Sequence, residues 1–213
     1  MTVDLAAAEE SGGRGEESRL AALSVLAQQV RELMDAAALT DVDEDEITGV
    51  TAELVALTER LNAARRDTPR PPEIAPDGSY RHLGNAVAGA GNPHALPLEV
   101  RPTPEGGVRA DLTFRPLHEG PPGAVHGGVT AMVLDQLLGS AAAVAGRVGM
   151  TATLTIRYRR PTPYGRPLVA TAEVSRSEGR KTWVEGRIAT PDDTVLVEAT
   201  GLFITPAQWV GSA

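Results

Sequence analysis

Hydrophobic residues in the first third of the chain recur every three or four positions, which is the period of an amphipathic helix. One stripe follows Ser18 and consists of Leu20, Leu23, Ala27, Val30 and Met34. A second follows Asp43, with Glu46 placed as in a capping box, and consists of Ile47, Val50, Leu54, Leu57 and Leu61. Both stripes are narrow. They predict a helical hairpin over residues 18–66, or a short coiled-coil contact with a second chain.

The segments on either side of this hairpin have no such period. Residues 1–17 contain several glycines and glutamates and predict a disordered leader. Residues 67–93 are rich in proline and glycine and predict a connector.

Residues 94–206 show the pattern of a sheet that contains one helix. Six segments have strand character, namely 96–103, 107–115, 150–160, 168–177, 181–190 and 194–204. Short turns force neighbouring strands to be antiparallel. The apolar run from Val129 to Ala145 has Asp135 as its only charged residue and predicts a buried helix. The sequence therefore predicts an α+β fold, an antiparallel sheet of five or six strands wrapped around one central helix, with residues 207–213 as a tail.

The strand over residues 150–160 alternates between two faces. Ala152, Leu154, Ile156 and Tyr158 fall on one face, which we expect to meet the core. Thr151 falls on the opposite face by the same count. The two faces therefore have different environments.

The junction at residues 121–128, before the apolar helix, has the composition of an anion-binding turn. Two prolines and a glycine break the chain, and His126, Gly127 and Gly128 then lead into the helix. The first amides of a helix lack intrahelical partners and carry partial positive charge, so they attract a negative oxygen. Glycine lets a ligand carbonyl come close to these amides. The junction is thus a candidate oxyanion hole.

Asp135 is a second candidate residue, because an isolated carboxylate in an apolar helix is costly to bury unless it is paired or functional. It follows Gly128 by two helical turns, or roughly 10 Å along the axis. One chain therefore does not bring its own Asp135 to its own helix start. A two-fold axis between antiparallel helices would bring Asp135 of one subunit to Gly128 of another. The alternative is a structural role, with the carboxylate bonded to nearby backbone.

Composition narrows the functional classes. Hydrophobic residues make up 42% of the chain, and the absence of cysteine excludes disulfide and thiolate chemistry within it. The net charge of −8 comes from residues 1–70, which contain 15 acidic and 7 basic residues. This acidic balance and an aromatic content of 3% argue against nucleic-acid binding.

His82 and His94 have no second ligand at metal spacing, so no metal is expected. We see no secretory signal and no membrane span, and expect a cytoplasmic protein.

Three motifs carry a resemblance to a known family. They are His126-Gly-Gly-Val-Thr-Ala-Met-Val-Leu-Asp135, the strand from Gly149 to Pro161, and Glu178-Gly-Arg-Lys-Thr-Trp-Val-Glu-Gly186. Together they resemble the PaaI-like hotdog-fold acyl-CoA thioesterases, and most of all the branch with histidine, aspartate and threonine at the active site. The resemblance covers about residues 94–206.

The resemblance implies a role for each matching residue. His126, Gly127 and Gly128 would hold the thioester carbonyl, and Asp135 of the opposite subunit would act as general base or nucleophile, assisted by Thr151. The phosphates of coenzyme A would lie over basic residues, which here are Arg157, Arg159, Arg160, Arg180 and Lys181. The implied protein is a homodimer or dimer of dimers that hydrolyses acyl-CoA without a metal or cofactor.

Two other functions fit the same residues. A non-catalytic acyl-CoA sensor would keep the fold and use Asp135 structurally, and a hotdog hydratase would act on an unsaturated acyl-CoA. The arginines at 157, 159 and 160 also fit a solvated strand end, without any phosphate.

Overall fold

The computed structural model describes residues 5–75 and 80–209, with residues 5–14 described by their backbone only. The chain divides into two compact units, residues 1–85 with 90–93 and residues 86–89 with 94–213. The start of the predicted leader and the end of the predicted tail lie outside the described residues. The predicted boundaries at residues 17, 66, 93 and 206 stay predictions.

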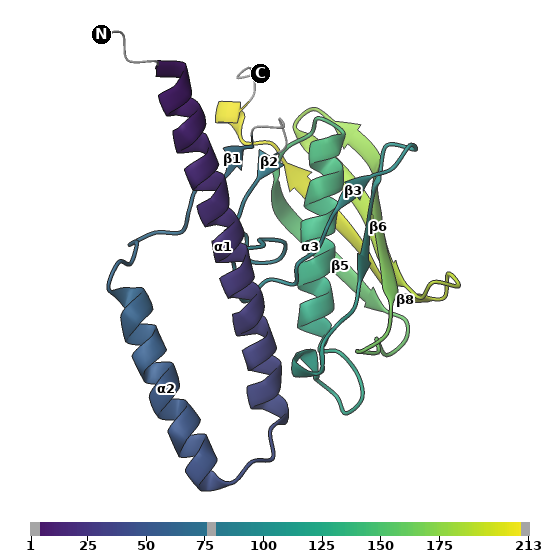
Figure 1. Ribbon diagram of the computed structural model, residues 1–213. Helices are drawn as coiled ribbons and strands as arrows, with labels where there is room; N and C mark the ends of the chain where they lie inside the picture. The colour runs from purple at the N-terminus through teal and green to yellow at the C-terminus, as the bar shows by residue number, and fades with distance from the viewer. Residues whose placement is uncertain (1–4, 76–79, 210–213) are drawn as a thin grey trace. The chain divides into compact units, whose positions relative to one another are not determined.

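The first unit contains two long helices that run in opposite directions, α1 (Leu5–Leu39) and α2 (Glu44–Asn62) (Figure 1). Helix α1 begins at Leu5, inside the range 1–17 that the sequence predicts as disordered. Alanine and glutamate favour helices strongly, and the stretch Leu5-Ala-Ala-Ala-Glu-Glu outweighs the glycines that follow it. Of the stripe predicted on this helix, Leu20 and Ala27 are buried.

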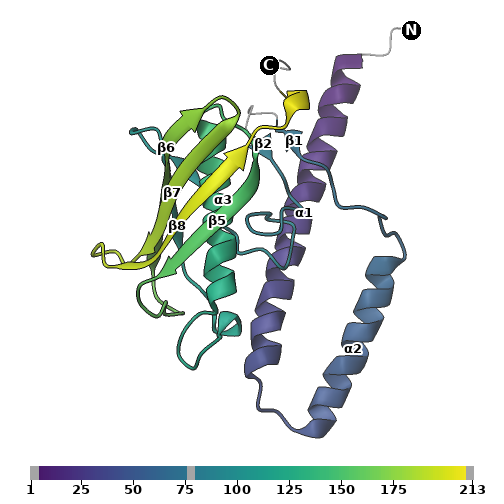
Figure 2. The ribbon, with the colours of Figure 1, turned by 180° about the vertical axis from the view of Figure 1, so that it is seen from behind.

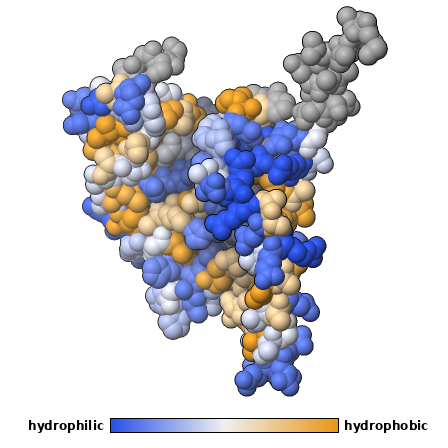
Figure 3. All heavy atoms as spheres, turned by 90° about the vertical axis from the view of Figure 1, so that its left-hand side faces the viewer, coloured by the Kyte–Doolittle hydropathy of each residue, from blue (hydrophilic) through white to orange (hydrophobic). Residues whose placement is uncertain are grey.

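Helix α2 has a well-formed start and an uncovered surface. Asp43 is its N-cap, and the Asp43 side chain accepts a hydrogen bond from the Glu46 amide at 2.9 Å, as the sequence predicts. No residue of α2 is buried. Hydrophobic residues consequently lie open among hydrophilic ones on this face of the molecule (Figure 3).

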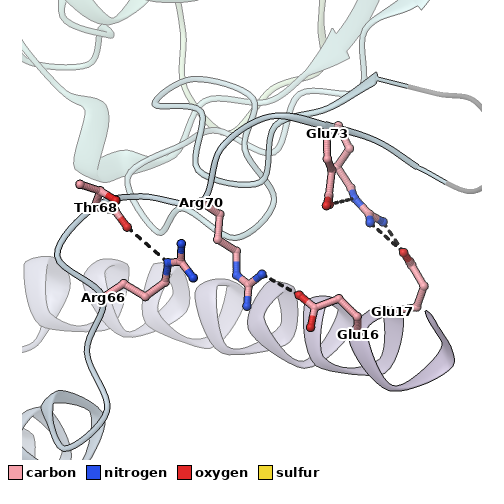
Figure 4. A network of polar contacts seen from close by, with 7 residues as sticks. Glu16, Glu17, Arg66, Thr68, Arg70 and Glu73 are labelled. Carbon is pink, nitrogen blue, oxygen red and sulfur yellow. Dashed lines mark hydrogen bonds and ion pairs between the residues drawn. The ribbon is translucent and has the colours of Figure 1, made fainter. Parts of the chain in front are cut away.

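The connector that follows α2 is tied to α1 by ion pairs (Figure 4). Arg70 Nη1 lies 2.6 Å from Glu16 Oε1, and Arg81 bridges Glu17 at 2.7 Å and Glu73 at 2.8 Å. The hydrogen bonds to Glu17 and then to Glu73 raise the pKa of Arg81. The short strands β1 (Glu73–Ile74) and β2 (Tyr80–Arg81) pair within this connector.

The second unit is built on one six-stranded antiparallel sheet, in the order β3-β4-β6-β7-β8-β5. The strands are β3 (Arg101–Pro102), β4 (Val108–Leu112), β5 (Met150–Tyr158), β6 (Leu168–Glu178), β7 (Lys181–Ala189) and β8 (Val195–Ile204). Short 3-10 turns span Pro116–His118 (η1) and Ala207–Trp209 (η2). Each of the four long strands agrees with a predicted segment to within a few residues.

Helix α3 (Gly127–Val144) lies along one face of this sheet (Figures 1 and 2). Its buried side chains are Thr130, Val133, Leu134, Leu137, Leu138, Ala141 and Ala142, and all of them except Thr130 belong to the hydrophobic core under the sheet. Among the described residues α3 is the one helix that is long and apolar enough to span a membrane, and its core position accounts for that composition. The predicted hotdog architecture is thus confirmed.

Strand β5 forms one edge of the sheet and contains an irregularity. Thr151 pairs with Phe203 and Thr153 pairs with Leu202, which leaves Ala152 as the extra residue of a β-bulge. Because the bulge reverses the alternation, Thr151 faces α3. The prediction that Thr151 lies on the face opposite the core is therefore wrong.

Candidate active site

The start of α3 is capped by a histidine side chain. His126 is the N-cap, and its Nδ1 accepts a hydrogen bond from the Gly128 amide at 3.0 Å. Since Nδ1 is an acceptor, a neutral His126 ring carries its proton on Nε2. The His126 side chain is exposed. It therefore presents an N–H donor at the surface of the turn.

Gly127 is held in place through its carbonyl. The hydroxyl groups of Thr130 and Tyr158 both donate to that oxygen, at 2.9 and 3.0 Å. The Tyr158 ring lies so close that a Cβ added at Gly127 would be 3.1 Å from it. Within the described part of the chain the Gly127 amide has no hydrogen-bond partner. The carbonyl of the turn is thus held by two hydrogen bonds, while the amide is still available as a donor.

Tyr158 was not predicted as a site residue. Its place in the alternation of β5 indicates only that it faces the core. That its hydroxyl reaches the helix start depends on how β5 lies beside α3, which no local pattern shows.

Asp135 is half-buried, and Thr151 holds its carboxylate. The Thr151 hydroxyl donates to Asp135 Oδ1 at 2.8 Å. The structure thus brings together the two residues that the resemblance pairs, one from α3 and one from β5. A hydrogen bond from a hydroxyl leaves the second carboxylate oxygen available to accept a proton.

The loop before His126 is stabilised by Glu119, another residue that the sequence did not point to. Its Oε1 accepts hydrogen bonds from the Gly123 amide at 2.7 Å and the Tyr164 hydroxyl at 3.2 Å. Gly123 has φ of 79°, a value that favours glycine. The hydrogen bond that the Tyr164 hydroxyl donates to Glu119 raises the pKa of Tyr164. The Glu119 carboxylate therefore fixes the turn that leads into α3.

Within one chain the two halves of the candidate site are separate. Gly128 and Asp135 lie on the same helix, and two turns separate them by about 10 Å along the axis. Strand β5 contacts both halves, at Thr151 near its start and at Tyr158 near its end. One protomer therefore presents a donor turn and a carboxylate that do not face each other.

The five predicted phosphate-binding residues do not form one cluster in a single chain. Lys181 lies level with Ile204 and Met150, whereas Tyr158 lies level with Val197 at the other end of the sheet. On β8 seven residues separate Ile204 from Val197, a distance of about 23 Å. Arg180 and Lys181 are thus far from Arg157, Arg159 and Arg160.

These arginines differ in their contacts. Arg159 forms an ion pair with Glu198 at 2.7 Å, Arg160 donates to the Val195 carbonyl at 3.0 Å, and Arg180 donates to the Thr205 carbonyl at 3.0 Å. Arg157 instead lines a groove of about 1050 Å³ on the sheet face away from α3. That groove contains neither the His126 turn nor Asp135. Residues 5–75 and 80–209 contain no group of three or more acidic or histidine side chains arranged to hold a metal ion.

Three comparisons agree on the class of protein. The family model described as the thioesterase superfamily matches residues 122–200, which include the His126 turn, Asp135 and Thr151. A solved thioesterase superfamily protein superimposes with a TM-score of 0.77 and 35% identity, covering 85% of this chain and 94% of that one. This coverage extends beyond residues 94–206, so part of the N-terminal region has a counterpart in that structure.

Curated relatives match a shorter stretch. Acyl-coenzyme A thioesterase THEM4 of Xenopus laevis is 41% identical over 90 residues, which are 42% of this chain and 40% of the relative. Acyl-coenzyme A thioesterase THEM5 of Homo sapiens is 31% identical over 87 residues, which are 40% of this chain and 35% of the relative. The chain thus spans about two fifths or less of the length of these relatives.

The sheet wrapped on α3, with a histidine-capped turn at the helix start, defines a hotdog-fold protein. The chain belongs to the thioesterase superfamily.

Proposed function

We propose that this protein hydrolyses acyl-CoA thioesters to a free acid and coenzyme A, in a site shared by two copies of the chain. The observation that carries the proposal is that one chain contains both parts of a hydrolytic site but holds them apart. These parts are the donor turn at His126–Gly127 and the carboxylate of Asp135, which Thr151 holds. The names of the curated relatives, acyl-coenzyme A thioesterases, support the substrate class.

The two halves supply what thioester hydrolysis needs. The Gly127 amide and the His126 Nε2–H would donate to the thioester oxygen and stabilise the oxyanion that forms when water adds to the carbonyl carbon. Asp135 would take the proton from that water as general base and return it to the departing thiolate of coenzyme A. A direct attack by the Asp135 carboxylate, followed by hydrolysis of the anhydride, uses the same residues.

The exposed edge of β5 is the surface through which we propose that two copies of the chain associate. A long edge strand with exposed apolar residues is normally covered, and here Met150 is 63% exposed and Tyr158 is 57% exposed. If β5 pairs antiparallel with β5 of a second copy about a two-fold axis at its middle residue, Leu154, then Thr151, which the bulge at Ala152 places two ladder steps from Leu154, lies opposite Ile156 of that copy. The carboxylate that Thr151 holds would then approach the Tyr158 and Gly127 of the other subunit.

The same two-fold axis would bring the predicted phosphate-binding residues of the two copies close together. In an antiparallel β5 pair, the end that carries Arg157, Arg159 and Arg160 lies beside Met150 of the second copy. Lys181 is level with Met150, two strands away, or about 10 Å. One symmetry axis would therefore bring together both the catalytic halves and the predicted phosphate-binding set.

A subunit-mixing experiment tests the shared site. Asp135→Asn removes the base, and Gly127→Pro removes the amide donor, so each homodimer should be inactive. In a mixed dimer one site combines the intact turn of one chain with the intact carboxylate of the other. Equal mixing should therefore restore about a quarter of wild-type activity, because half of the dimers are mixed and each has one working site.

Activity is measured as thiol release from a panel of acyl-CoAs, and the cysteine-free chain gives no background with a thiol reagent. Absence of recovery on mixing, or a fully active monomer, would contradict a shared site. Acyl-CoA binding without thiol release by the wild-type protein would favour the sensor, and hydration of crotonyl-CoA, followed by absorbance, would favour the hydratase.

A further inference from the structure

Helix α2 carries a regular hydrophobic seam that the folded chain leaves uncovered. Its members are separated by three and four residues in strict alternation, and they are Ile47, Val50, Leu54, Leu57 and Leu61. This is the spacing of positions a and d of a coiled coil, with Ile47, Leu54 and Leu61 at a. Four of the five are 39% to 57% exposed, and none is buried.

The residues that flank the seam are compatible with a helix partner. Thr51 and Thr58 lie at position e, and their hydroxyls donate to the carbonyls of Ile47 and Leu54 in the same helix, each at 2.8 Å. These hydroxyls already have a partner, so covering them leaves no unsatisfied group. Glu53 and Arg60 lie at position g and are exposed.

A second copy of α2 fits this seam in the antiparallel direction. When Leu54 of one helix packs against Leu57 of the other, Val50 packs against Leu61, and each layer occurs twice by symmetry. Position g of one helix then lies beside position g of the other. Glu53 of each copy is consequently placed next to Arg60 of its partner, which gives two attractive pairs.

The parallel arrangement lacks this match. In a parallel pair position g lies beside position e of the following heptad, so Glu53 would face Thr58 and have no partner of opposite charge. The charges therefore favour antiparallel pairing. They also specify a partner with this same pattern, which a second copy of the chain supplies.

We propose that α2 is a self-association element, which joins two copies of the protein through an antiparallel coiled coil with Glu53–Arg60 pairs on both sides. This contact is separate from the β5 edge and does not depend on the proposed enzymatic activity.

Charge reversal tests the proposal without altering the seam. Glu53→Arg alone and Arg60→Glu alone each turn two attractive pairs into two repulsive ones. We expect each to lower the apparent association constant of the α2 contact by about tenfold. An equal mixture of the two variants restores both attractive pairs in the mixed complex, and so does the double variant E53R/R60E. The mixture should therefore associate as tightly as the wild type.

Cross-linking provides a readout specific to α2, because the natural chain has no cysteine. In the antiparallel register, position 51 of one helix lies about 3 Å along the axis from position 58 of the other, whereas the two copies of position 51 are about 13 Å apart. A short bismaleimide should therefore join a Thr51→Cys chain to a Thr58→Cys chain in high yield. Two Thr51→Cys chains should join poorly, and they serve as the matched control.

The outcomes separate the possible occupants of the seam. Loss of cross-linking in each single charge variant and its recovery in their mixture support the antiparallel pair. No cross-link between chains, with no effect of charge reversal, would mean that α2 docks elsewhere, on α1 for example, and would overturn the proposal. Equal cross-linking of like and unlike cysteine positions would overturn the antiparallel register.

Discussion

The substitution Gly127→Pro isolates the backbone donor that the proposed mechanism needs. Gly127 is the first residue of α3, a position where proline is favoured because its fixed φ suits the helix and the N–H has no intrahelical partner. His126 has φ of −59° and ψ of 132°, a conformation that a residue before proline readily adopts. The variant therefore removes one N–H while the backbone keeps its path.

The matched control is Gly127→Ala. Both variants add a Cβ that would lie 3.1 Å from the Tyr158 ring, so both require a shift of a few tenths of an ångström, and only proline removes the donor. Loss of one oxyanion donor typically lowers kcat by about 10²- to 10³-fold. We expect Gly127→Ala to lose about tenfold or less, and Gly127→Pro to lose about a hundredfold more than that.

The assay is thiol release under saturating acyl-CoA, with circular dichroism to verify that each variant is folded. The two variants share the contact of the added Cβ with Tyr158, so the difference between them reports the loss of the N–H together with the two ring carbons that only proline adds. Equal activity of Gly127→Pro and Gly127→Ala would refute the assignment of the Gly127 amide as the oxyanion donor.

Three further predictions follow from single contacts. Thr151→Val should lower kcat about tenfold by releasing the Asp135 carboxylate, and Thr151→Ser should retain most activity because it keeps the hydroxyl. Glu119→Gln should lower the raised pKa of Tyr164 toward the ordinary 10.0, measured by absorbance with Tyr164→Phe to assign the signal. The contribution of this bond to stability is complete below pH 10 and is lost as the pH rises through the raised pKa of Tyr164. Arg31→Met should lower the free energy of opening of residues 90–92 by about 1–3 kcal/mol, measured by hydrogen exchange, because the buried guanidinium donates to two carbonyls there.

The elements that the sequence predicts well are those whose pattern reflects burial. Helix α3 is apolar because its side chains pack into the core of the sheet, and Gly146, the residue after its C-cap, adopts φ of 71°, a value that favours glycine. Strands β6 to β8 are separated by short turns, so their order along the chain is also their order in the sheet. The position of β5 beside β8 has no such local signal, because β6 and β7 lie between these two strands in the sequence.

The pairing of Asp135 with Thr151 shows a second feature that the sequence pattern does not predict, namely the face of the strand on which a residue lies. The resemblance suggested the pair, but the alternation of β5 placed Thr151 on the wrong face. The error arises at Ala152, an extra residue that nothing in the local sequence marks as a bulge. A single unpaired residue reverses the face of every side chain beyond it.

That bulge is what lets one strand serve both halves of the candidate site. Thr151 and Tyr158 are separated by seven residues, an odd number, so in a regular strand they would face opposite sides of the sheet. With Ala152 unpaired, Thr151 lies opposite Phe203 on the α3 side, and both hydroxyls reach the helix, one at Asp135 and one at Gly127. In a β5 without the bulge, Tyr158 would still contact the turn at Gly127, but Thr151 would face away from α3 and Asp135 would lose its hydrogen-bond partner. The irregular pairing of the edge strand is therefore the feature of the fold on which the geometry of both halves depends.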